Sequence, residues 1–230
     1  MTQNMANKKT IAKICGGLAA LAFIAVASLK DNLHLGSVTL AENSQGNQYA
    51  LGIYPKISAA GTNIVGNHYS IGLLIGSNNY ETNSVHKGNS TAIGLVRTAN
   101  IYFANSVHNG KSTALGLITG RNNYEINSIH NGKSTAICLI GAGNIYGTNS
   151  IHNGNNTAMG LIGAVNNYKT NSIHNGNNTA MGLINGSNNY ETNSVHNGNS
   201  TTRGLISDDE QGRHLFGNKI IKNQKQAVKN

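Results

Sequence analysis

A unit of twenty-two residues returns almost unchanged from about residue 80 to residue 206, and it constrains the fold more than any other feature. One histidine recurs once per period, at His86, His108, His130, His152, His174 and His196. One tyrosine recurs in the same way, at Tyr80, Tyr102, Tyr124, Tyr146, Tyr168 and Tyr190. A unit this short cannot bury an apolar face by itself, so it must stack on its neighbours. The repeat therefore predicts an elongated scaffold of stacked units.

The copy that begins at Asn167 shows how one period divides. Residues 168–174 are rich in β-branched and polar residues, and residues 175–178 have turn chemistry. Residues 179–184 form a second apolar run, and residues 185–188 turn again. No helical periodicity occurs in the unit. The sequence therefore predicts an all-β fold, a two-layer β-solenoid of strand-turn-strand rungs with a 22-residue period.

Glycine marks the first turn of every copy, because glycine enters the left-handed region of backbone conformation freely. These turn glycines are Gly88, Gly110, Gly132, Gly154, Gly176 and Gly198. Gly46 and Gly66 occupy the same place in two degenerate earlier rungs, which brings the predicted number of rungs to about eight.

Alternate residues of a strand face opposite sides, so each copy has two sets of columns. The columns that we expect inside contain Tyr80, Thr82, Ser84, His86, Thr91, Ile93 and Leu95. The columns that we expect outside contain Glu81, Asn83, Val85, Ala92, Gly94 and Val96. The choice rests on Leu95, which stays leucine in every later copy, whereas Glu81 becomes Phe, Gly or Lys. Val85 and Val96 also form apolar columns, which leaves the reverse orientation open.

The two ends of the chain differ from the repeats. Residues 1–27 resemble a signal peptide, with lysines before an apolar run at 14–26 and small residues before a cut at Ser28; an uncleaved anchor is the alternative. Residues 28–42 form an N-terminal segment, residues 43–206 form the solenoid, and residues 207–230 form a basic, polar C-terminal tail. We expect the chain to be secreted or to lie at the cell surface, without stable membrane insertion after signal cleavage.

The charge and cysteine content limit the partners. Loss of the three signal lysines from 17 basic residues leaves 14 basic residues against 8 acidic ones. This excess is mild and scattered, so we expect no nucleic-acid partner. One cysteine, Cys138, remains after signal cleavage, so no internal disulfide can form. As an exposed thiol it could link two rods, and otherwise it is a tolerated residue.

The recurring polar residues do not combine into a reactive site. A metal site needs three or four converging ligands, whereas the histidines form a single column, so we expect no metal and no cofactor. Ser84 and His86 resemble a nucleophile and its base, but they lack an acidic partner and recur six times, so we expect no enzyme. Protonation of neighbouring stacked histidines should loosen the rod in acid.

A column of asparagines precedes each tyrosine strand, at Asn100, Asn122, Asn144, Asn166 and Asn188. Stacked amides form hydrogen bonds along a cross-β axis, which favours in-register assembly. The threonine column that begins at Thr91 suggests ice binding as a minor alternative, although the partner column that contains Ile93 is aliphatic.

The layout of the repeats resembles the curlin repeat family, the secreted subunits of bacterial amyloid fibres. The resemblance covers residues 43 to 206 and rests on the signal-like start, the period and turns such as His86-Lys87-Gly88-Asn89. His86 and its equivalents stand where the family carries glutamine, and Thr91 and its equivalents stand where it carries asparagine. The resemblance implies self-association into fibres, with a nucleating or secretion partner.

We therefore expect a secreted structural subunit of an extracellular or cell-surface amyloid-like fibre, with roles in biofilm and adhesion. Small outward residues such as Ala92 and Gly94 would let rods pack side by side. A monomeric solenoid adhesin that binds glycans or a host surface is the main alternative.

Overall fold

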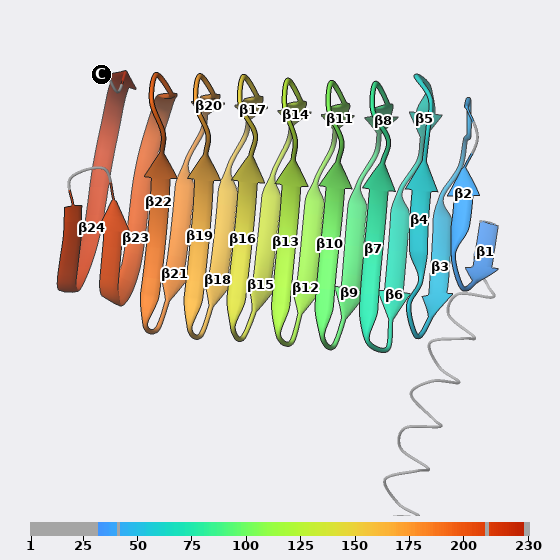
Figure 1. The fold of residues 1–230 in the computed structure, drawn as a ribbon, viewed down its shortest axis with the longest axis horizontal. Helices are drawn as coiled ribbons and strands as arrows, with labels where there is room; N and C mark the ends of the chain where they lie inside the picture. The colour runs from blue at the N-terminus through green and yellow to red at the C-terminus, as the bar shows by residue number, and fades with distance from the viewer. Residues whose placement is uncertain (1–31, 41, 210–211, 228–230) are drawn as a thin grey trace, which may run out of the picture.

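The computed structural model describes residues 32–40, 42–209 and 212–227, and it describes side chains up to residue 204. Within these ranges the chain forms strands and no helix. The strands wind into a parallel β-solenoid of about eight turns with a 22-residue period, which confirms the predicted fold class (Figure 1). The predicted signal peptide lies outside the described residues.

Each regular turn has three strands, which stack into three ladders. Five-residue strands form one broad face, called here the Thr face: β6 (His68–Gly72), β9 (Ser90–Gly94), β12 (Ser112–Gly116), β15 (Ser134–Cys138), β18 (Asn156–Gly160) and β21 (Asn178–Gly182). Six-residue strands form the opposite Tyr face: β7 (Ile75–Tyr80), β10 (Arg97–Tyr102), β13 (Thr119–Tyr124), β16 (Gly141–Tyr146), β19 (Gly163–Tyr168) and β22 (Asn185–Tyr190). Three-residue strands form a narrow His edge: β8 (Val85–Lys87), β11 (Val107–Asn109), β14 (Ile129–Asn131), β17 (Ile151–Asn153) and β20 (Ile173–Asn175).

Equivalent strands of successive turns pair in parallel and in register. His108 lies between His86 and His130, and Tyr102 lies between Tyr80 and Tyr124. Because every residue lies over the residue one period away, each repeated position becomes a continuous column. The two broad faces are the predicted two layers, and the His edge closes them along one side (Figure 1).

The first turns are shorter than the regular ones. Their strands are β1 (Asn32–Leu35), β2 (Val38–Leu40), β3 (Gln48–Gly52), β4 (Lys56–Ala59) and β5 (Ile64–Val65). β1 pairs with β3 and β2 pairs with β4, so the stack already includes residues of the segment that precedes the predicted repeats.

The last turn is one long strand. β23 (Val195–Asp209) pairs in parallel with β20, β21 and β22, and then β24 (Gly212–Ala227) pairs antiparallel along it. The region expected to be a basic, polar tail therefore contributes a strand of sixteen residues. This antiparallel strand covers the C-terminal end of the parallel ladders.

The strand boundaries within a turn differ from the predicted ones. The expected strand at 168–174 is interrupted: β19 ends at Tyr168, the chain bends, and β20 begins at Ile173. The expected turn at 185–188 lies inside β22. The bend depends on Asn171, whose φ is 56°, and on the equivalent asparagine of every regular copy. Asparagine tolerates the left-handed region better than most residues, so it makes a corner that the glycine pattern did not indicate.

The prediction of which columns are buried was partly wrong. Tyr80, Ser84 and His86 are buried as expected, but Thr82 is exposed. In the next strand the inward and outward positions are exchanged relative to the prediction, since Ala92 is buried. The columns that lie outside, contrary to prediction, contain Thr91, Ile93 and Leu95, and those that lie inside contain Ala92 and Gly94.

The corner at Gly88 explains this reversal. It turns the chain without changing which side faces inward, so His86, Ser90 and Ala92 all point into the interior. The interior is narrow, and tyrosine and asparagine side chains from the Tyr face fill it. The opposing positions on the Thr face therefore hold small residues.

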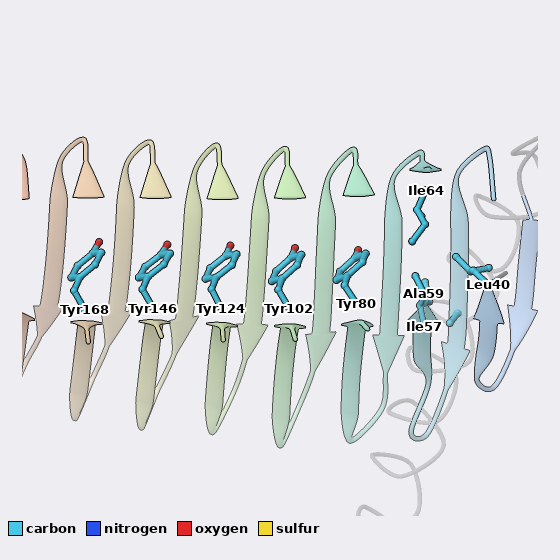
Figure 2. Packing of buried hydrophobic residues seen from close by; sticks show 10 residues of the cluster. Leu40, Ile57, Ala59, Ile64, Tyr80, Tyr102, Tyr124, Tyr146 and Tyr168 are labelled. Atoms are coloured by element: carbon cyan, nitrogen blue, oxygen red, sulfur yellow. The ribbon is translucent and has the colours of Figure 1, made fainter. Parts of the chain in front are cut away.

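The core is a row of stacked tyrosines that ends in an aliphatic cluster near the N-terminal end. Figure 2 shows Tyr80 to Tyr168 in one line, followed by Ile64, Ile57, Ala59 and Leu40. In the pairing register Ala59 takes the place of Tyr80, and Ile64 takes the place of His86. The asparagine and tyrosine ladders thus end at apolar residues in the pairing register, whereas the histidine stack continues to His68, whose ring lies 4.4 Å from that of His86.

Candidate functional surfaces

The tyrosine and histidine columns form two adjoining aromatic stacks in the interior. Tyr102 lies 4.7 Å from Tyr124 between ring centroids, with the planes 4° apart, and His108 lies 4.9 Å from His130. Within one turn, Tyr102 and His108 are 4.6 Å apart. This spacing matches the separation of paired strands, about 4.8 Å. All the predicted histidines and the tyrosines from Tyr80 to Tyr168 are buried, and Tyr190 is partly buried.

A hydrogen-bond chain joins the three walls of the turns that contain His108 and His130. The His108 Nε2–H donates to the Gly88 carbonyl oxygen at 2.9 Å, which leaves Nδ1 as an acceptor for the Ser112 hydroxyl at 3.2 Å. The Tyr102 hydroxyl lies 2.6 Å from the Ser112 Oγ and donates to it. Each histidine in this chain is therefore held in its neutral form.

Burial has opposite effects on the two aromatic columns. Desolvation disfavours the charged form, so it lowers the pKa of His86 to about 4 and the pKa of His174 to about 3. Desolvation, reinforced by His130, likewise holds the pKa of His108 well below 6.5. Desolvation also raises the pKa of Tyr124 well above 10, with a further contribution from Tyr146. Both columns are uncharged at neutral pH.

The asparagine column fastens the two broad faces together. The Asn100 Nδ2 donates to the Asn122 Oδ1 at 2.8 Å along the stack, and it also donates to the Thr113 carbonyl on the Thr face at 2.8 Å. The same pair of bonds recurs at Asn122, Asn144 and Asn166, and Asn188 ends the ladder with a bond to the Thr201 carbonyl. These amides therefore hold the faces together and keep the turns in register.

The Ser84 and His86 side chains are neighbours in sequence but are not joined. Ser84 Oγ is buried without a hydrogen-bond partner, and His86 Nε2 bonds to the Gly66 carbonyl oxygen at 2.8 Å. The serines of the four following copies are likewise buried without a partner. Within the described ranges no three His, Cys, Asp or Glu residues lie where they could hold a metal ion. Nor does this part of the chain contain a helix long and apolar enough to cross a membrane.

The turn glycines have the positive φ that the sequence indicated. Their φ values lie between 143° and 155° at Gly88, Gly110, Gly132, Gly154, Gly176 and Gly198. They also approach one another closely, since a Cβ on Gly110 would lie 2.1 Å from the carbonyl oxygen of Gly88. Glycine is therefore required twice at this corner, by conformation and by space.

The third corner, between the Thr and Tyr faces, exposes an apolar edge of two columns: the leucine column of Leu95, which we expected inside, and the column of Val96, which we expected outside. Eleven aliphatic side chains there are between 38% and 60% exposed. They are Leu73, Leu95, Val96, Leu117, Ile118, Leu139, Ile140, Leu161, Ile162, Leu183 and Ile184. In Figure 1 this apolar edge runs along the lower bends, opposite the His edge. It is the largest departure from the predicted burial.

The structure also places Cys138, for which two alternatives were open, and the Thr91 column, which we expected inside. Cys138 is buried, and desolvation raises the pKa of its thiol, so the thiol is not placed to link two rods. The Thr91 column faces outward on the Thr face, beside the aliphatic column of Ile93 and Met159. This face therefore alternates one hydroxyl column with one apolar column.

Comparisons with known proteins identify no relative. No protein-family model matches this sequence, no curated protein matches it, and no solved structure matches its fold. The resemblance to curlin repeats rests on the layout of the repeats alone.

Proposed function

We propose that this chain is a secreted structural subunit that associates with further copies of itself into a fibre or coat at the cell surface. The observation that carries the proposal is the apolar edge, a continuous row of exposed aliphatic side chains along the solenoid. Soluble proteins rarely leave an apolar patch of more than a few hundred Å² uncovered.

The size of the apolar edge suits contact with a second copy. The edge supplies eleven aliphatic residues, each between 38% and 60% exposed, toward the roughly 20–30 residues that a standard interface uses on each side. A stable interface buries about 800 Å² on each partner. The leucines repeat at the rung spacing, so the edge of a second copy presents the same spacing, and the two rows can interdigitate.

The ends of the solenoid favour lateral over end-to-end association. At the C-terminal end β24 runs antiparallel and covers the parallel ladders, so a next copy cannot continue them in register. Lateral contact through the apolar edge needs no free strand edge. The curlin-like layout of the repeats agrees with a fibre subunit, and the signal-like residues 1–27 agree with export. A nucleating or secretion partner belongs to the same proposal.

Lysine substitutions on the apolar edge test the proposal. The double variant Leu139→Lys/Leu161→Lys places two charges in the middle of the edge. The matched control is Asn155→Lys/Asn177→Lys, in a column that already contains lysine at positions 111 and 133. Sedimentation and electron microscopy should show fibres or lateral assemblies for the wild type and the control, and a monomer for the edge variant. A wild-type chain that stays monomeric for days at high concentration would overturn the proposal.

A solenoid adhesin is the second candidate function, because the Tyr face carries a feature that the assembly does not need. That feature is the glycine-rich strand β16 (Gly141–Tyr146).

A further inference from the structure

One rung of the Tyr face lacks most of its outward side chains. Along β16 and the residue after it, the outward positions are Gly141, Gly143, Ile145 and Gly147, so three of four are glycine. In the preceding turn the same positions hold Thr119, Arg121, Asn123 and Glu125. Three of the four outward positions of this turn therefore lack a side chain, and the next turn also has glycine, Gly163, in the Gly141 column.

The backbone does not require two of these glycines. A Cβ on Gly141 would meet nothing within 4 Å, and a Cβ on Gly143 would approach no atom closer than 3.6 Å. Neither residue has a positive φ. Glycine in a strand costs about 0.5–1 kcal/mol relative to alanine, so both positions lose stability without a structural need. Gly147 differs, because its Cβ would lie 2.6 Å from the Glu125 carbonyl carbon.

Three adjoining hollows of about 300, 240 and 250 Å³ are all lined by Ile145. Gly147 lines the first and Gly141 and Gly143 line the second, whereas the third lies beside them and is lined by none of these glycines. We call the three hollows together the β16 trough. Arg97, Arg121 and Lys169 line one of the hollows, and Asn123 and Asn167 contribute amides. The trough thus crosses several turns and has an apolar floor.

The charges of the β16 trough are not balanced. Its cations are Arg97, Arg121 and Lys169, and its one carboxylate is Glu125. None of the three cations forms an ion pair with another residue of the described chain. The Asn167 Oδ1 beside these cations is buried without a hydrogen-bond partner. Unpaired cations beside free amides indicate a ligand that carries both negative groups and hydroxyls.

We propose that the β16 trough binds an extended acidic saccharide that bears carboxylate or sulfate groups. Arginine holds such groups through paired N–H donors, and the asparagine amides match sugar hydroxyls. Arg121 and Lys169 lie two rungs apart and four positions apart along the strand, about 16 Å between Cα atoms. Both side chains line the same hollow, so a ligand with two negative groups on an extended chain can contact both.

Two other classes of ligand fit less well. β16 is paired on both sides, with β13 and β19, so an acidic peptide cannot add as a further strand. A single-stranded nucleic acid needs exposed aromatic side chains on which its bases stack, whereas the tyrosines of these strands point into the core. The ligand must be held by side chains on a flat face, which suits a saccharide.

Binding to short oligosaccharides tests this inference. The probes are a hexamer of galacturonic acid, a sulfated glycosaminoglycan hexasaccharide, and neutral maltohexaose. Isothermal titration or chemical-shift mapping should show binding of one or both acidic probes that weakens with salt, and no binding of maltohexaose. The carboxylated and sulfated arms identify which acidic group the trough prefers.

Matched variants locate the binding. Arg121→Gln/Lys169→Gln should weaken binding at least tenfold. Lys111→Gln/Lys133→Gln, with the same loss of charge at the corner between the His edge and the Thr face, should change it less than twofold. Gly143→Val fills the trough with the residue that the next turn has at Val165, and it should also weaken binding. Ser77→Val, in the same column but outside the trough, is its control.

Three results would overturn the inference: no binding of either acidic hexasaccharide, equal effects of the two charge variants, or tighter binding of a poly-glutamate peptide or single-stranded DNA 12-mer. Sedimentation of the same samples reports assembly separately. Failure of this inference is thereby distinguished from failure of the proposed assembly, since the apolar edge and the trough lie on different surfaces.

Discussion

Acid should unfold the solenoid well above the pH at which most proteins lose stability, because its buried histidines are held neutral. The perturbation is a decrease in pH from 7.5 to 5. Burial lowers the pKa of His86 from 6.5 to about 4 and that of His174 to about 3. Between pH 6.5 and about 4 the unfolded chain therefore binds protons that the folded chain does not. The histidines therefore do not reduce the free energy of unfolding above pH 6.5, and they reduce it increasingly as the pH decreases below 6.5.

The structure sets the size of this loss. Six histidines are at most 1% exposed, namely His68, His86, His108, His130, His152 and His174. At pH 5.5, one unit below the unfolded pKa, protonation of each histidine in the unfolded chain lowers the free energy of unfolding by about 1.4 kcal/mol. For the six histidines the total is about 8 kcal/mol. Domains are typically stable by about 5–15 kcal/mol, so we expect the acid midpoint between about pH 5 and 6.

The assay is denaturant unfolding followed by far-UV circular dichroism at several pH values. The matched variant is His108→Gln/His130→Gln/His152→Gln, in which glutamine keeps a donor for the turn carbonyls. With three of the six histidines removed, the loss of unfolding free energy between pH 7.5 and 5.5 should decrease from about 8 to about 4 kcal/mol. The comparison uses the pH slope, so a general change in stability does not affect it. Equal slopes for the wild type and the variant would refute the argument.

Three further predictions follow from the interior. Gly132→Ala should lower the free energy of unfolding by about 3 kcal/mol, because φ is 152° and the new Cβ would lie 2.0 Å from a carbonyl oxygen. Gly141→Ala should leave the free energy of unfolding unchanged or raise it by up to about 1 kcal/mol. Thermal melts compare the two variants. Asn122→Ala should lower the free energy of unfolding by about 3 kcal/mol, because it leaves buried amide partners unsatisfied. Asn131→Ala, in an exposed ladder, should lower it by less than about 0.5 kcal/mol. Denaturant midpoints measure both changes. The buried Cys138 thiol should react with a thiol reagent only when the chain unfolds; rapid reaction in the native state would contradict its burial.

The sequence indicated the candidate surfaces only in part. The Asn83 and Asn105 positions could have indicated the extra corner, because an asparagine recurs there in every regular copy and tolerates a positive φ. The apolar edge was missed because a persistent leucine column was taken as a sign of burial. Gly141 and Gly143 were visible as departures from their columns, but their meaning depends on Arg97 and Lys169, which only the stacked turns bring to the same hollow.

The sequence by itself determined the period, the parallel register and the identity of the columns. Any winding that repeats every 22 residues places Asn100 over Asn122 and His108 over His130, whatever the shape of the turn. The tertiary structure decided which columns are buried. Alternation along a strand fixes two faces but not which of them continues inward after a corner. The corner at Gly88 keeps His86 and Ala92 on the same side, so the narrow interior receives alanine and the leucines remain outside.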